Sequence, residues 1–169
     1  ESSEGSNEWL YKQRLISADP QDFGFFGYKV AMDGTGNTIV VGADGEDDYT
    51  GSVYSFSRES AAKEWSETQI LVREDRERND NFGGALALSS DSQTLIVAAP
   101  GAKIKNARDS GVVCLYKRQG DKWISAKRLT RPESSVREAD FFGWSIAVDV
   151  NAHRVVVTAP QSNYELGSA

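Results

Sequence analysis

A Phe-Gly pair recurs three times along this chain, each time followed at one fixed distance by a pair of small residues that closes an apolar run. The small pairs begin sixteen residues after the phenylalanines. The three copies are Phe26-Gly27 with Gly42-Ala43, Phe82-Gly83 with Ala98-Ala99, and Phe142-Gly143 with Thr158-Ala159. Such self-similarity indicates an array of one supersecondary unit. The search for function therefore turns to loops that a scaffold presents.

Other landmarks keep the same phase and divide each period into four short strands. Trp9, Trp65 and Trp123 each precede a leucine by six residues. We expect a strand after each Phe-Gly pair, a second in the apolar run, a third opened by glycine, and a fourth containing the tryptophan. The first two strands are predicted at 28–32 and 38–43, 84–88 and 94–99, and 144–148 and 155–159. The third strands begin at 51 and 111, and a third copy begins at 167.

The composition of these strands predicts their place in a sheet. The second strands carry consecutive β-branched residues, as in 39–41 and 155–157, which is typical of strands covered on both faces. The tryptophan segments mix apolar with charged residues, which suits a half-exposed outer strand. Four-stranded antiparallel sheets at a steady period are the blades of a β-propeller. A β-sandwich is the alternative, but it does not require every fourth strand to return to the same signature.

In a propeller, each phenylalanine of the repeat would lie between neighbouring sheets. The glycine after it would permit a close backbone approach or a positive φ. These repeats resemble FG-GAP repeats, the blades of the integrin α-subunit type of propeller, and the resemblance runs from Trp9 to Ala169. It implies an all-β fold and a secreted or surface protein that binds proteins or glycans, and it therefore places this chain outside the cell or on its surface.

The predicted organisation is a polar, flexible lead-in over residues 1–8 and a propeller segment over 9–169. Within the segment we expect the last strand of a preceding blade at 9–15, blades at 26–72 and 82–130, and a partial blade at 142–169. The chain holds roughly 2.9 periods, whereas propellers close with about 4–8 blades. An incomplete ring with unpaired sheet edges is expected. Its partners would include further blades of the same parent chain or neighbouring subunits.

Composition excludes several classes of function. The net charge is −6, so binding to nucleic acid is not expected. No apolar stretch approaches the ~20 residues that span a bilayer. The single cysteine, Cys114, lies in an apolar strand and favours a buried structural role, and it leaves the redox compartment undetermined.

Two acidic features are candidates for a binding site. The loop after the second strand of the first blade carries Asp44, Glu46, Asp47 and Asp48 beside Tyr49. Antiparallel alternation puts such loops on one rim with the connections that enter each blade, where Asp19 and Asp22 lie. This loop is either a site for a cation or a basic partner or a solvated charge run.

The second feature is the turn between the first two strands of each blade, where integrin-type blades often bind calcium. Each turn offers a single carboxylate and is too short for an alternating oxygen-ligand loop, so a hairpin turn is favoured. We expect no metal and no cofactor, with Asp33 and Asp149 as the ligands if calcium binds after all.

No catalytic constellation is recognisable. The only histidine, His153, falls in a predicted turn, and neither a phosphate loop nor zinc spacing is present. We therefore expect no catalytic residues. Two hypotheses remain: a non-catalytic extracellular binding or structural module, or a blade segment of a propeller-containing hydrolase whose catalytic residues lie elsewhere.

Overall fold

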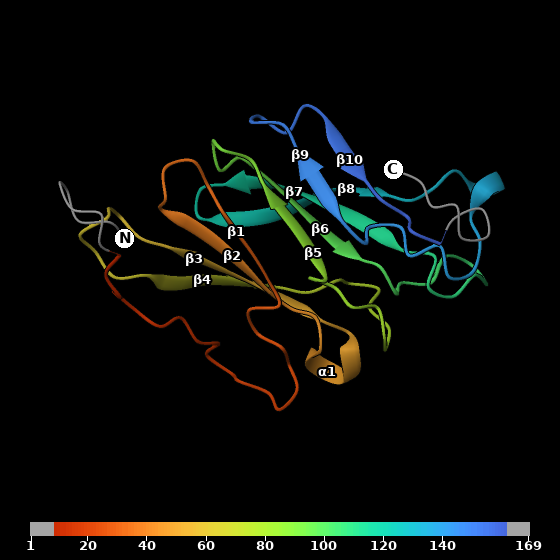
Figure 1. Cartoon of the computed structure of the whole chain (residues 1–169), viewed down its shortest axis with the longest axis horizontal. Coiled ribbons are helices and arrows are strands. Elements are labelled where there is room, and N and C mark those ends of the chain that lie inside the picture. Colours follow the sequence, from red (N-terminus) through yellow and green to blue (C-terminus); the bar gives the residue numbers. More distant parts are fainter. Residues whose placement is uncertain (1–8, 162–169) are drawn as a thin grey trace.

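The computed structural model describes residues 9–161, which form an all-β array of three successive antiparallel sheets (Figure 1). The first sheet has the order β1 (Lys29–Met32), β2 (Thr38–Ala43), β3 (Ser52–Ser57) and β4 (Ser66–Leu71). The second has the order β5 (Ala85–Leu88), β6 (Thr94–Ala99), β7 (Val112–Gln119) and β8 (Lys122–Leu129). The third pairs β9 (Ile146–Val148) with β10 (Val155–Val157). Two short helical turns, α1 (Glu46–Tyr49) and a 3-10 turn (Glu133–Ser135), complete the fold.

The sheets follow one another like blades, with first strands beside first strands and outer strands beside outer strands. β1 contacts β5, β5 contacts β9, and β4 contacts β8. One face of the middle sheet packs on the first sheet, and its other face packs on the third. A two-layer sandwich has a single shared interior, so the double burial of the middle sheet excludes that alternative. The array is a segment of a β-propeller whose ring is not closed.

Burial agrees with the predicted order of strands. Every residue of β6 is buried, as is nearly all of β2, while β4 and β8 are largely accessible. The outer strands are the tryptophan-containing segments, as predicted. Trp123 is itself buried, because its ring faces the first sheet and donates a hydrogen bond from Nε1 to the Ser55 hydroxyl at 3.0 Å.

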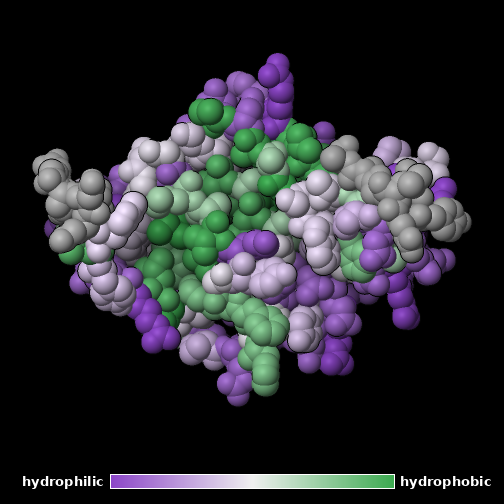
Figure 2. All heavy atoms as spheres, viewed as in Figure 1, coloured by the Kyte–Doolittle hydropathy of each residue, from purple (hydrophilic) through white to green (hydrophobic). Residues whose placement is uncertain are grey.

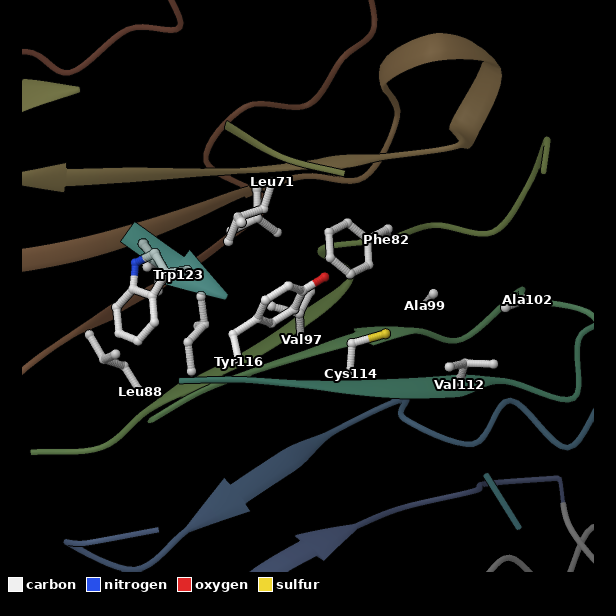
Figure 3. Close-up of a cluster of buried hydrophobic side chains, with 13 residues drawn as sticks. Leu71, Phe82, Leu88, Val97, Ala99, Ala102, Val112, Cys114, Tyr116 and Trp123 are labelled. Atoms are coloured by element: carbon white, nitrogen blue, oxygen red, sulfur yellow. The ribbon is translucent and has the colours of Figure 1, made fainter. Parts of the chain in front are cut away.

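Phe82 lies between the first two sheets (Figure 3). Its side chain has no exposed surface, and it shares one cluster with Leu71 of the first sheet and Val97 and Tyr116 of the second. Phe142, which is partly buried, packs against the cluster between the second and third sheets. Phe26 is only half-buried and packs on its own sheet, with its ring centroid 5.2 Å from that of Tyr54.

Glycines let neighbouring blades approach backbone to backbone at each seam. Gly83 has a φ of +95°, and its carbonyl oxygen occupies the space that a Cβ on Gly42 would need. Gly51, with a φ of +85°, faces the backbone of Phe82 in the same manner, and Gly111 faces that of Phe142. Side chains at these positions would push the sheets apart.

An Arg–Asp pair lies within each connection that enters the second and third blades. Arg73 Nη1 lies 2.8 Å from Asp80 Oδ2, and both side chains are almost fully buried. Arg131 and Asp140 repeat the pair at 3.3 Å. Each aspartate also accepts a hydrogen bond from the backbone N–H three residues earlier. The run 73–80 therefore combines a buried ion pair with exposed charges.

Glutamine side chains from one tryptophan segment bond to the backbone of the next tryptophan segment. The Gln69 amide accepts from the backbone N–H of Trp123 at 2.7 Å and donates to its carbonyl oxygen at 3.1 Å. Gln13 makes the same pair of bonds with Trp65, at 2.8 and 3.2 Å. The amide thus satisfies the backbone groups that an outer strand directs away from its own sheet.

Residues 10–15, predicted as part of the last strand of a preceding blade, pair with no strand among residues 9–161. A strand needs a neighbouring backbone ladder, and no strand of a preceding sheet lies within residues 9–161. The segment instead adds Leu15 to the apolar cluster on the first sheet. The expected lead-in at 1–8 and the strand beginning at Gly167 lie outside the described residues. β10 is shorter than predicted and only partly buried, since no third strand covers it among those residues.

Candidate functional site

One rim of the array carries the loops that follow each second strand and the connections that enter each next blade. This rim is called the first rim below. The backbone N–H groups of Asn81 and Phe82 donate to the carbonyl oxygens of Tyr49 and Thr50, at 2.8 and 3.1 Å. The next seam repeats this pairing between 141–142 and 109–110, at 2.8 and 3.2 Å. The expected placement of these loops on one rim is therefore what the structure has.

The acidic loop of the first blade contains a left-handed turn. Within α1, Asp47, Asp48 and Tyr49 have φ values of 51°, 58° and 65°. For residues other than glycine, left-handed backbone costs roughly 1–2 kcal/mol per residue. Strain of this kind persists only where the surrounding structure holds it, and it concentrates at functional segments.

The five predicted residues of this loop do not converge on one point. Asp44 and Glu46 are buried, whereas Asp47 and Asp48 are exposed. Both oxygens of Glu46 accept from the Tyr54 hydroxyl, at 2.8 and 2.9 Å. Burial raises the pKa of Glu46, and it also raises the pKa of Tyr54 to about 12. Glu46 therefore supports the loop from inside and is not available to a ligand.

The two exposed carboxylates form ion pairs across the seam with the next connection. Asp48 lies 3.0 Å from Arg78, and Asp47 lies 3.8 Å from Arg76. The polarity reverses at the second seam, where Lys105 of the loop lies 2.9 Å from Glu133 of the connection. Each of these loops therefore carries a charge opposite to that of the connection beside it, and the ion pairs join neighbouring blades. Each exposed pair contributes under ~1 kcal/mol.

Tyr49 and the connection before the first blade complete this part of the rim. The Tyr49 ring is 43% exposed and lies 6.1 Å from that of Phe25. The connection reaches the acidic loop through Gln21, whose side-chain oxygen accepts from the Asp47 N–H at 3.0 Å. Asp19 lies close enough to act on Glu46 electrostatically. The rim therefore presents aromatic surface as well as carboxylates.

The opposite rim carries the turns that were the calcium candidates. Asp33 Oδ1 accepts from the N–H groups four and five residues later, and Asp149 does the same. In the second blade, the Ser89 hydroxyl takes this role. These carboxylates act as hydrogen-bond acceptors that close hairpin turns. Within residues 9–161, no three acidic, histidine or cysteine side chains lie together in a way that could hold a metal ion.

Sequence reasoning missed a pocket of about 270 Å³ on the first rim, where three blades meet. Its walls include Tyr28, Gly84 and Trp144, which each follow a Phe-Gly pair directly. Asp44, Lys29, Asn81 and Phe141 also line it. Figure 2 shows apolar residues gathered over the middle of the face that carries β1, β5 and β9. The sequence does indicate this pocket: the residue after the Phe-Gly pair is aromatic in the first and third copies and glycine in the second.

The repeat now agrees with an independent comparison. The family model described as FG-GAP repeat matches residues 9–56 and 65–116, which is more than half of the chain. The chain belongs to the FG-GAP repeat family. Among curated proteins, a search gives no match. FG-GAP repeats occur mainly in extracellular or cell-surface proteins, typically as non-catalytic binding or structural units.

The boundaries of the FG-GAP matches are offset from the sheets. Each match begins at a tryptophan segment and ends in a third strand, so β4 belongs to the second match while it pairs with β3 from the first. The second match therefore supplies strands to two blades. Hydrogen bonds between β3 and β4 therefore join two successive repeats within one sheet.

The one histidine and the one cysteine of the chain lie in different surroundings. His153 is exposed in its turn, and its backbone N–H caps Asp149. Cys114 is buried, and burial raises the pKa of its thiol, so a thiolate is disfavoured. Over residues 9–161, no helix is long and apolar enough to cross a membrane.

Proposed function

We propose that this chain is a non-catalytic module of an extracellular or cell-surface protein, which presents its first rim to a protein or glycan partner and joins further blades at its two ends. Membership of the FG-GAP family supports the binding or structural role. The observation that carries the proposal is the rim itself, where strained left-handed residues hold Tyr49 and Phe25 partly exposed.

The two ends of the array support the second half of the proposal. Val30 and Met32 of β1 are 61% and 58% exposed, although the equivalent Leu86 and Leu88 of β5 pack into the seam with the first sheet. At the other end, Val156 of β10 is 53% exposed. A preceding and a following blade would cover these faces as the internal seams are covered, and no metal or cofactor is needed for this role.

A binding experiment with two matched double variants tests the rim. The immobilised chain is exposed to secreted and cell-surface fractions of the source organism, and binding is followed by interferometry. Asp47→Asn/Tyr49→Ser alters the first rim, while Lys63→Ser/Asp121→Asn alters hairpins on the opposite rim. We expect at least tenfold weaker binding for the first variant and unchanged binding for the second. Equal losses in both variants, or binding that survives the first, would refute a partner site on this rim.

A further inference from the structure

The pocket where the three blades meet is lined by aromatic residues from two of the blades. Tyr28 and Trp144 come from the two flanking blades and are 53% and 56% exposed. Gly84, from the middle blade, occupies the same repeat position without a side chain and lines the pocket, and a Cβ there would lie 3.0 Å from the Asn81 carbonyl oxygen. Phe141 supports Trp144 edge-on, with ring centroids 5.8 Å apart. Partly exposed aromatic walls around a small concave space are typical of ligand sites.

Asp44 supplies the pocket with an incompletely satisfied acceptor. Its side chain is 8% exposed, and Oδ1 is buried without a hydrogen-bond partner. Burial raises the pKa of this carboxyl, and Lys29 acts against that shift. A buried polar atom without a partner costs about 1–3 kcal/mol. Asp44 lines the pocket, so a ligand whose donor reaches Oδ1 after a small rotation of the carboxyl would gain binding free energy.

The charges around the pocket select against an ionic ligand. Lys29 Nζ already lies over the Tyr28 ring, 5.4 Å from its centroid, so the protein itself fills the cation position there. An anion would meet Asp44 as well as Lys29. A hydroxyl group both donates and accepts, and it can therefore pair with a carboxyl, an ammonium and the Asn81 amide, which all line the pocket.

We infer that this pocket binds a single neutral sugar ring, with its apolar face against Trp144 or Tyr28 and its hydroxyls directed to Asp44, Lys29 and Asn81. This inference rests on the proposed binding role of the first rim, to which it adds the chemistry of one ligand. It concerns side chains other than the Asp47 and Tyr49 positions that test the rim.

Saturation-transfer NMR on the full chain tests the inference. The neutral probes are glucose, galactose, mannose and N-acetylglucosamine, and the charged probes are N-acetylneuraminic acid and methylammonium. We expect saturation transfer to at least one neutral sugar. Its dissociation constant should rise at least tenfold in Trp144→Ala, in Tyr28→Ala and in Asp44→Asn, the last of which keeps the shape of the side chain.

Trp9→Ala is the matched control, since Trp9 is 82% exposed and does not line the pocket. It should bind the sugar as the wild type does, and circular dichroism should show all four variants folded. The inference is overturned if no neutral sugar responds, if binding persists in both aromatic variants, or if only a charged probe responds. Partner capture that still depends on Asp47 and Tyr49 would then leave the proposed function standing without the sugar site.

Discussion

The replacement of Phe82 by alanine offers the sharpest test of the seams between blades. The ring is fully buried and contacts both flanking sheets, so its loss creates a cavity that neither sheet can fill alone. Phe→Ala changes in such sites cost about 3–5 kcal/mol. For a chain of this size, each kcal/mol lowers the melting temperature by about 2–4 °C, so we expect a decrease of roughly 6–20 °C.

Phe26→Ala is the matched comparison, because Phe26 holds the same repeat position but is half-buried and packs on one sheet only. Its cost should be clearly smaller. Both free energies of unfolding are measured by urea denaturation followed by circular dichroism, with calorimetry for the melting temperatures. An equal or larger loss of unfolding free energy in Phe26→Ala would refute the idea that Phe82 stabilises the chain through its burial between two sheets.

Three further predictions concern the seams and the rim. Gly42→Ala should destabilise the chain by more than a surface substitution, about 1–3 kcal/mol by urea denaturation, because its Cβ would overlap the Gly83 carbonyl. Glu46→Gln should raise the melting temperature at pH 7. Burial raises the pKa of Glu46 above its ordinary value of 4.5, so the stability of the wild type falls as the pH rises from 4.5 through the raised pKa. Below this pH range Glu46 is protonated and neutral like glutamine, so the difference in stability between the two proteins should shrink there. A difference that does not depend on pH would contradict this prediction. Gln69→Ala should promote concentration-dependent association, seen by light scattering, because it uncovers backbone groups of Trp123, and a strictly monodisperse variant would count against edge protection.

The sequence alone was sufficient for the class of fold, the strand order within a blade and the repeat positions. Phenylalanine, glycine and the small pairs recur in phase because every blade meets its neighbour through the same geometry, so one local rule applies at each seam. The consecutive β-branched residues of the second strands likewise predicted that these strands are buried, because each second strand lies between two neighbouring strands of its own sheet. The strand predicted at 9–15 needs a preceding blade to pair with, and residues 9–161 include no such blade, so this part of the pattern stays a prediction.

Tertiary structure decided what the polar residues do. The acidic residues of the first loop form one cluster along the sequence, but the fold buries Asp44 and Glu46. It pairs Asp47 and Asp48 with arginines about thirty residues away. The pocket between Tyr28 and Trp144 likewise exists only because three blades bring distant positions together. Apolar periodicity is a local property that a strand carries in its own sequence, whereas the surroundings of a charge depend on which segments fold against it.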